Sequence, residues 1–350
     1  MIVFFDAKAS PADLDALKSY CANLGLTTLL VPGQGQIKVC VGGPTLHLDT
    51  AAIGRLRGVT RVLPVHSNYK LSARQAQPAG TVVTVGNDIR IGGEELVLIA
   101  GPCAIESEES AHVIARSVRK AGANLMRGGV FKARTSPYAF QGTEEEGFRI
   151  LASVREETGM RFVTEAVDER SLELVEEYSD MIQIGARNMQ NFALLKKVGA
   201  CRKPVLLKRG LAARLEELLL AADYIMCGGN AAVALCERGI RTFSDHSRNT
   251  LDLGIVPAIK ELSHLPVVVD PSHGAGIRRR VPAMALASVA AGADAIMLEV
   301  HNDPEHALSD GEQSLALDQF AELVPRLAAV AAAINHPLGC ETAPARYVDL

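Results

Sequence analysis

The sequence predicts an α/β protein in which a (β/α)8 TIM barrel follows a small N-terminal ferredoxin-like α+β domain. From residue 95 onward, eight short apolar runs alternate with amphipathic stretches of helical period over roughly 240 residues. None of these runs is followed by the Gly-x-Gly-x-x-Gly pattern that marks many open doubly wound sheets, the alternative fold. The first 70 residues differ, because their segment order, β-α-β-β-α-β, is typical of the split βαβ motif.

Residues 1–70 are expected to form the N-terminal domain. Ser10 followed by Pro11 predicts a helix start, since a Ser N-cap accepts a hydrogen bond from a free backbone amide and Pro suits the first turn. One buried helical face is expected from Leu14, Leu17, Cys21 and Leu24. The other predicted elements are strands at 1–5, 27–31, 36–41 and 59–65, a turn at 32–35 and a helix at 50–56. The domain carries no convergent cluster of His, Cys and acidic residues, so we expect it to regulate or assemble the protein.

Residues 71–94 are expected to join the two domains. The polar stretch 72–81 contains Pro78 and Gly80 and is typical of a linker. Residues 81–91 alternate apolar and polar side chains around a Gly-Asn-Asp turn, which predicts a β-hairpin. We expect this hairpin to close the floor of the barrel.

The barrel is expected to occupy residues 95–335, and residues 336–350 to form a C-terminal tail. Its eight predicted strands lie at 96–100, 124–127, 161–165, 181–184, 205–208, 224–226, 267–270 and 295–300. Helices are predicted between them, for example at 109–121, 142–158, 171–178, 191–198, 212–221 and 282–291. In such a barrel the segments that follow the strands line one mouth, where active sites are built.

Composition narrows the classes of function. The 350 residues are 48% hydrophobic and 22% charged, which is usual for a soluble globular protein. A net charge of −4 gives no general attraction to nucleic acid or acidic membranes, so neither is expected as a partner. We expect a cytoplasmic location, because the sequence shows no signal peptide and no run of about 18 apolar residues. Seven scattered cysteines fit a reducing compartment rather than a disulfide framework.

Cationic side chains recur in the segments that follow the predicted strands. They are Arg127, Lys132, Arg134, Arg187, Lys208 and Arg238. Because these segments share one mouth, we expect the six cations to converge on one cavity. Such a cavity is suited to small polyanions, since arginines bind phosphates and carboxylates through paired hydrogen bonds.

Candidate metal ligands lie at the same mouth. Cys103 follows the first predicted strand, His273 follows the seventh, Glu299 lies at the end of the eighth, and Asp310 lies in the loop after it. One thiolate, one imidazole and two carboxylates suit Mn²⁺, Fe²⁺, Co²⁺ or Zn²⁺ better than Mg²⁺ or Ca²⁺. His301 is a rival ligand, because residues two apart on a strand can face the same side.

Six short motifs carry a specific resemblance. They are Gly101-Pro102-Cys103, Lys132-Ala133-Arg134-Thr135, Ile184-Gly185-Ala186-Arg187, Leu207-Lys208-Arg209-Gly210, Cys236-Glu237-Arg238-Gly239 and Asp270-Pro271-Ser272-His273. In this order, over about residues 95–325, they resemble the 3-deoxy-D-arabino-heptulosonate 7-phosphate (DAHP) synthase family, in particular its bacterial branch with an N-terminal ferredoxin-like (ACT-like) regulatory domain. The resemblance implies a transferase that condenses phosphoenolpyruvate with D-erythrose 4-phosphate and water. Its products are DAHP and phosphate, in the first step of the shikimate pathway to aromatic amino acids.

The resemblance also implies substrate-binding roles for eight residues. It implies that the carboxylate side of phosphoenolpyruvate is bound by Arg127, Lys132 and Lys208. The phosphate of the same substrate is implied to be bound by Arg187, Arg238 and the amide of Ala186. The sugar phosphate is implied to be bound by Arg134 and Thr135.

Four residues are implied to hold a divalent ion that polarises the sugar aldehyde. They are Cys103, His273, Glu299 and Asp310. Glu165, at the end of the third predicted strand, is our candidate for positioning the water that adds to the substrate. Lys132 is our candidate proton donor, because a Lys in a cationic cluster can have a lowered pKa.

Two alternatives remain for the barrel. The related 3-deoxy-D-manno-octulosonate 8-phosphate synthases use arabinose 5-phosphate and carry Lys-Ala-Asn-Arg where this chain has Lys-Ala-Arg. Ala133, which this chain shares with them, replaces a Pro common in DAHP synthases, but the inserted Asn is missing and the N-terminal domain is present. The second alternative is a metabolite-binding barrel without catalysis.

Regulation and assembly are further expectations from the resemblance. Tyrosine or phenylalanine is implied as a feedback inhibitor acting through residues 1–70, and a homotetramer is implied as the assembly. A domain that serves only as an assembly surface is the alternative.

Overall fold

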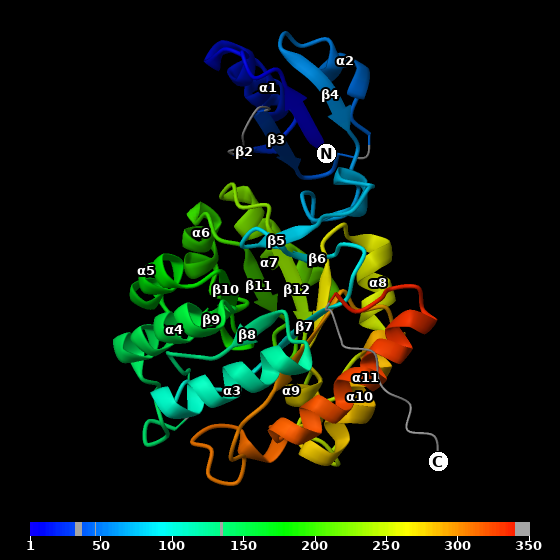
Figure 1. The fold of residues 1–350 in the computed structure, drawn as a ribbon. Coiled ribbons are helices and arrows are strands. Elements are labelled where there is room, and N and C mark those ends of the chain that lie inside the picture. The colour runs from blue at the N-terminus through cyan, green and yellow to red at the C-terminus, as the bar shows by residue number, and fades with distance from the viewer. Residues whose placement is uncertain (32–36, 46, 134–135, 340–350) are drawn as a thin grey trace.

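The structure is a computed structural model that describes residues 1–31, 37–45, 47–133 and 136–339. Figure 1 shows a small N-terminal α+β domain on one end of a larger barrel, with the hairpin of β5 (Val83–Val85) and β6 (Ile89–Ile91) between them. The predicted turn at 32–35, as well as Arg134 and Thr135, lies outside the described residues. Within the described part, no helix combines the length and apolar character needed to cross a bilayer.

The N-terminal domain is a four-stranded antiparallel sheet with two helices. The sheet order is β2-β3-β1-β4. The elements are β1 (Ile2–Phe5), α1 (Pro11–Asn23), β2 (Thr27–Val31), β3 (Ile37–Gly42), α2 (Thr50–Gly54) and β4 (Val59–Leu63). The element order matches the predicted β-α-β-β-α-β.

Helix α1 begins where the sequence predicts. The Ser10 hydroxyl accepts a hydrogen bond from the Asp13 amide, and the Asp13 carboxylate accepts one from the Ser10 amide. Leu17 and Cys21 are buried. The prediction that Leu24 belongs to the buried face is wrong: the helix ends at Asn23, and Leu24 is 51% exposed because it lies in the C-cap, past the last helical turn.

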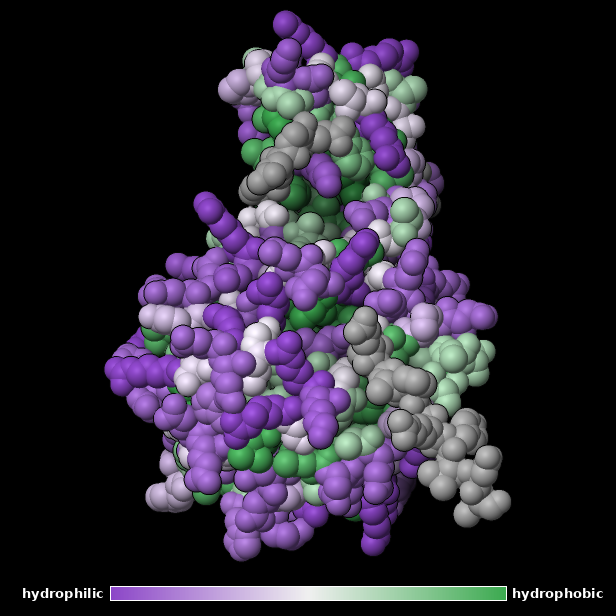
Figure 2. All heavy atoms as spheres, viewed as in Figure 1, coloured by the Kyte–Doolittle hydropathy of each residue, from purple (hydrophilic) through white to green (hydrophobic). Residues whose placement is uncertain are grey.

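Strand β1 is buried on both faces. Val3 and Phe5 pack with the helices of their own domain, together with Met1. Ile2 and Phe4 point the other way and belong to the hydrophobic cluster of the barrel. Ile2 and Phe4 also line a cavity of about 310 Å³. Figure 2 shows hydrophobic atoms at the narrow junction between the two parts. This strand therefore connects two cores.

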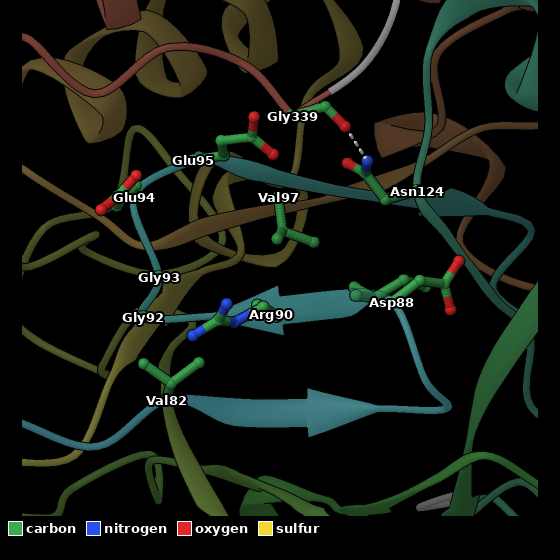
Figure 3. Close-up of a pocket in the computed structure, with 11 residues that line it drawn as sticks. Val82, Asp88, Arg90, Gly92, Gly93, Glu94, Glu95, Val97, Asn124 and Gly339 are labelled. Carbon is green, nitrogen blue, oxygen red and sulfur yellow. Dashed lines mark hydrogen bonds between the residues drawn. The ribbon is translucent and has the colours of Figure 1, made fainter.

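The hairpin lies across the amino-terminal end of the barrel strands. Its four inward residues, Val83, Val85, Ile89 and Ile91, are buried with the side chains that fill the barrel interior. A cavity of about 790 Å³ lies beside it, and Figure 3 shows Arg90 and Glu95 among its lining residues. At its rim, the Asn124 side chain donates a hydrogen bond to the Gly339 carbonyl.

The barrel is closed and contains eight parallel strands. Each strand from β7 to β14 pairs with the strands before and after it in sequence, and β14 pairs with β7 to close the barrel. The strands are β7 (Val97–Gly101), β8 (Leu125–Arg127), β9 (Arg161–Ala166), β10 (Met181–Ile184), β11 (Val205–Lys208), β12 (Val233–Glu237), β13 (Val267–Val269) and β14 (Ala295–Glu299). The predicted fold class is confirmed.

One predicted strand is wrong. Residues 224–226 belong to the end of helix α7 (Leu215–Cys227), and the sixth strand is β12. The run Tyr-Ile-Met is apolar because Ile225 and Met226 lie on the buried face of that helix. Three residues are too few for periodicity to distinguish a buried helix from a strand.

The barrel helices surround the strands (Figure 1). Besides α7 they are α3 (Glu108–Ala121), α4 (Glu144–Thr158), α5 (Glu169–Tyr178), α6 (Phe192–Ala200), α8 (Ile255–Leu262), α9 (Pro271–Ala275), α10 (Val281–Ala290) and α11 (Leu317–Ala333). Four 3-10 turns complete the elements: η1 (Arg74–Ala76), η2 (Ala186–Asn188), η3 (Arg278–Arg280) and η4 (Gly311–Gln313). The segments between strand ends and helices form the mouth described next.

Candidate active site and metal centre

Cys103 lies just beyond the carboxyl end of β7, and the backbone before it is shaped by a close approach. Gly101 has φ +154°, and a Cβ there would lie 2.2 Å from the Arg127 carbonyl oxygen, so only glycine fits. The Cys103 sulfur is buried, 3.0 Å from Asp310 Oδ2 and 3.0 Å from Lys132 Nζ. Burial, reinforced by the charge of Glu299, raises the pKa of the Cys103 thiol to about 11.

The four predicted metal ligands converge. Ligand atoms of Cys103, Glu299 and Asp310 all lie within 4.8 Å of one another. His273 Nε2 approaches them from α9, 3.5 Å from Glu299 Oε1 and 3.8 Å from Asp310 Oδ2. The rival His301 is placed elsewhere: its Nε2 faces the Glu106 carboxylate at 3.4 Å.

His273 is oriented by a buried carboxylate. Its Nδ1 lies 2.7 Å from Asp270 Oδ2, which also accepts a hydrogen bond from Lys208 Nζ at 2.7 Å. Burial lowers the pKa of His273 despite the opposing pull of Asp270 and Glu299, which favours the neutral ring. With the Nδ1 proton donated to Asp270, the Nε2 lone pair faces two carboxylates, an arrangement that a bound cation would stabilise.

The two carboxylates are held from outside the cluster. Glu299 Oε1 accepts a hydrogen bond from Arg127 at 3.1 Å, and Glu299 Oε2 accepts one from Gln313. Asp310 has φ +55°, a left-handed backbone uncommon for a residue other than glycine. Arg248 Nη1 lies 3.0 Å from Asp310 Oδ1. Both ligand side chains therefore have a fixed orientation.

A cavity of about 290 Å³ opens beside this cluster. Its lining includes His273 and Asp310, six cations and the Glu165 carboxylate. The cations are Arg127, Lys132, Arg187, Lys208, Arg238 and Arg248. Five of them were expected from the sequence, whereas Arg134 and Thr135 lie outside the described residues. The excess of cations over carboxylates suits an anionic ligand.

Several of these cations already contact acidic or sulfur groups. Arg127 donates to Pro102 and Glu299, yet its Nε is buried and has no hydrogen-bond partner among the described residues. A buried N–H group without a protein partner is a donor that a ligand or a water molecule would satisfy. Burial lowers the pKa of Arg238, and the opposing pull of Asp270 does not offset it.

The pKa of Lys132 is shifted in the opposite direction from the one expected. Burial acts to lower its pKa, but Cys103 and Glu165 outweigh burial and the pKa lies above its usual value. The expectation of a lowered pKa is therefore wrong, because the side chains of Cys103 and Glu165 lie among the cations around Lys132. Lys132 remains protonated at neutral pH, which is compatible with a proton donor.

Glu165, in β9, and Ala186, just after β10, line the same cavity. Glu165 Oε2 accepts a hydrogen bond from Gln183 at 3.1 Å. Gly185 leaves room for this carboxylate, since a Cβ there would lie 2.0 Å from Glu165 Oε1. Ala186 begins η2, and its place in the cavity is compatible with an amide that binds an anion.

Three groups at the site are not predicted from the sequence. They are Asp270 as a partner of His273, and the pair formed by Arg248 and Gln313. Asp270 was visible within the Asp-Pro-Ser-His motif, three residues before the ligand. Arg248 lies further along the segment after β12 that also carries Arg238, so a reading of the whole segment would have included it.

Comparisons with known proteins agree with this geometry. The DAHP synthetase I family model matches residues 73–335. A Thermotoga maritima protein named phospho-2-dehydro-3-deoxyheptonate aldolase is 43% identical over 335 residues, covering 96% of this chain and 99% of that protein. A crystal structure of a DAHP synthase from Thermotoga maritima has a TM-score of 0.77 at 42% identity, covering 96% of this chain and 98% of that chain.

A second group of relatives is more distant. A protein from Syntrophotalea carbinolica named 2-dehydro-3-deoxyphosphooctonate aldolase is 35% identical over 267 residues, covering 71% of this chain and 95% of that protein.

Proposed function

The chain belongs to the DAHP synthetase I family and is a DAHP synthase, and we propose that it condenses phosphoenolpyruvate with D-erythrose 4-phosphate by a reaction that requires a divalent metal ion. The observation that carries the proposal is that the candidate metal ligands lie beside the cation-lined cavity. His273 and Asp310 belong to the ligand cluster and also line the cationic cavity. An ion held by the cluster would therefore lie beside bound anions.

The residues present fit a divalent ion. Cys103, His273, Glu299 and Asp310 would hold it, and the mixed sulfur, nitrogen and oxygen donors suit Mn²⁺, Fe²⁺, Co²⁺ or Zn²⁺. When bound, such an ion supplies Lewis-acid polarisation of the aldehyde oxygen. Because the Cys103 thiol has a raised pKa, binding would release its proton, so affinity for the ion should increase with pH.

The cations would orient phosphoenolpyruvate. We assign its carboxylate side to Arg127, Lys132 and Lys208, which line the cavity and contact Glu299, Cys103 and Asp270 respectively. We assign its phosphate to Arg187, Arg238 and the Ala186 amide, in the segments that follow β10 and β12. The sugar phosphate is assigned to Arg134 and Thr135 through the motif that contains them.

The chemistry then needs a proton donor and an oriented water. Carbon 3 of the enol attacks the aldehyde carbon, water adds at carbon 2, and phosphate leaves by C–O cleavage. Lys132, which stays protonated, would give a proton to the new alkoxide. Glu165, held by Gln183 within the cavity, would position the water.

The four-carbon sugar is favoured by the extent of the similarity. The Thermotoga relative covers 96% of this chain, including the N-terminal domain, whereas the octulosonate relative covers 71%. Ala133, which lines the cavity, is the observation that favours arabinose 5-phosphate as a second candidate. This candidate differs only in the aldehyde substrate.

We assign residues 1–70 to feedback inhibition by tyrosine or phenylalanine, within a cytoplasmic homotetramer. The support is the full-length similarity to the Thermotoga protein and the packing of β1 against the barrel. Deletion of residues 1–70 tests this assignment. Loss of inhibition with retained turnover would support it, and loss of the oligomer alone would instead assign the domain to assembly.

The central experiment follows phosphoenolpyruvate consumption with erythrose 4-phosphate and arabinose 5-phosphate in parallel, before and after chelation. We expect consumption with the four-carbon sugar, its loss on chelation and its return with Mn²⁺ or Co²⁺. Preference for the five-carbon sugar would overturn the substrate assignment. Unchanged turnover after exhaustive chelation would overturn the metal requirement.

A further inference from the structure

Arg248 and Gln313 form a polar relay between the two metal-ligating carboxylates. Arg248 Nη1 lies 3.0 Å from Asp310 Oδ1 and 2.8 Å from Gln313 Oε1. The Gln313 amide nitrogen in turn donates a hydrogen bond to Glu299 Oε2. One guanidinium and one amide thus join the carboxylate at the end of β14 to the carboxylate in the loop that follows this strand.

The relay contacts one oxygen of each carboxylate and leaves the other for the cluster. Asp310 Oδ2, the oxygen not bound by Arg248, lies 3.0 Å from the Cys103 sulfur and 3.8 Å from His273 Nε2. Glu299 Oε1, the oxygen not bound by Gln313, lies 3.5 Å from His273 Nε2. This division of inner and outer oxygens fixes the rotation of both carboxylate groups.

The position of Arg248 is built into the backbone. Gly276 has φ +67°, and a Cβ there would lie 2.2 Å from the Arg248 Cβ, so the arginine segment packs directly on the chain after α9. Next to it, the Asn249 side chain donates to the His273 carbonyl at 2.8 Å. Gln313 is 1% exposed, which shields its two hydrogen bonds from water.

We propose that Arg248 is a positioning residue that preorganises both carboxylates for the divalent ion. It contacts Asp310 directly and Glu299 through Gln313. The inference rests on the ion proposed above. Residues that orient metal ligands typically change metal affinity by about 10–100-fold when they are removed. A residue that only bound substrate anions would instead change KM and leave metal affinity unaltered.

The test measures Co²⁺ binding to the full chain, by the Co²⁺–thiolate charge-transfer band and by competition with a chelator. Arg248→Met and Gln313→Leu should each weaken Co²⁺ binding by about 10–100-fold. Arg248→Lys, which keeps the charge but loses the planar fork, should fall between Arg248→Met and the unaltered protein. Arg279→Met, at an exposed arginine of the same region, should match the unaltered protein.

The double variant Arg248→Met/Gln313→Leu separates a relay from two independent effects. In a relay, the double variant should bind Co²⁺ no more than about threefold weaker than the weaker single variant. Full additivity, or Co²⁺ affinity of Arg248→Met within twofold of the unaltered protein, would overturn the inference. Failure of the unaltered protein itself to bind Co²⁺ would overturn the proposed metal site, and the inference with it.

Discussion

Replacing Asp270 by Asn removes the negative charge from a carboxylate that serves two buried partners. Oδ2 lies 2.7 Å from Lys208 Nζ and 2.7 Å from His273 Nδ1, and Oδ1 accepts the His273 amide at 3.0 Å. An Asn that keeps its oxygen on the His273 amide must turn its NH₂ group towards the lysine. Lys208 then faces a donor, and His273 Nδ1 must accept a hydrogen bond instead of donating one.

The expected cost follows from burial. The side chains of Lys208 and Asp270 are 5% and 1% exposed, so the lysine charge cannot be solvated once its partner is lost. Removing one partner of such a pair costs about 3–5 kcal/mol of stability. The exchanged tautomer of His273 directs Nε2–H towards the cluster and should weaken Co²⁺ binding by at least about tenfold.

Guanidinium unfolding without added metal measures the first effect, and the Co²⁺–thiolate band measures the second. Asp294→Asn is the matched control: Asp294 pairs with Lys260 at 2.8 Å, but that lysine side chain is 38% exposed, so about 1 kcal/mol is expected and no change in Co²⁺ binding. Adding Lys208→Met to Asp270→Asn should recover at least about 1 kcal/mol, because no charge is then left unpaired. A cost below about 1 kcal/mol for Asp270→Asn, or no recovery in the double variant, would refute the reasoning.

Three further outcomes are expected. Gly185→Ala should displace Glu165, because the new Cβ would lie 2.0 Å from Glu165 Oε1. We expect kcat/KM to fall by about 100-fold while Co²⁺ affinity stays unchanged. Equal turnover would remove Glu165 from the mechanism. Asp223→Ala should leave the amides of Lys70, Leu71 and Ser72 without their acceptor, cost about 1–3 kcal/mol and speed proteolysis of the linker. His264 bridges Leu71 and Thr81, and burial lowers its pKa below 6.5, so its neutral form stabilises the fold. That contribution is present above pH 6.5 and is lost as the pH falls through the lower folded value; thermal unfolding from pH 7.5 to 5 should show this loss, and His264→Gln should reduce it.

Much of the fold and of the candidate site follows from local patterns. The candidate metal ligands can be predicted because each lies at the carboxyl end of a barrel strand or in the segment after it, and the closed barrel brings the ends of those strands together. The strand expected at 224–226 was wrong because a short apolar run fits either a helix face or a strand. A run of only three residues is too short for periodicity to tell the two apart.

The contact between Arg248 and Gln313 and the direction of the pKa shift of Lys132 could not be predicted in the same way. Arg248 and Gln313 meet because two loops from different parts of the chain fold against each other, and no spacing within either loop records this contact. The pKa of Lys132 depends on distances to Cys103 and Glu165, which come from different parts of the chain. Both properties belong to tertiary contacts rather than to sequence motifs.

The two-sided burial of β1 sets an energetic threshold for any movement of the N-terminal domain. Swinging the domain away as a rigid body would return Ile2 and Phe4 to water, at about 1.5–3 kcal/mol for each side chain. The detached arrangement would therefore be disfavoured by a factor of roughly 10² to 10⁴ from these two residues alone. An effector that works by displacing the domain must bind the displaced arrangement more tightly by a similar factor, whereas one that stiffens the docked arrangement needs no such difference.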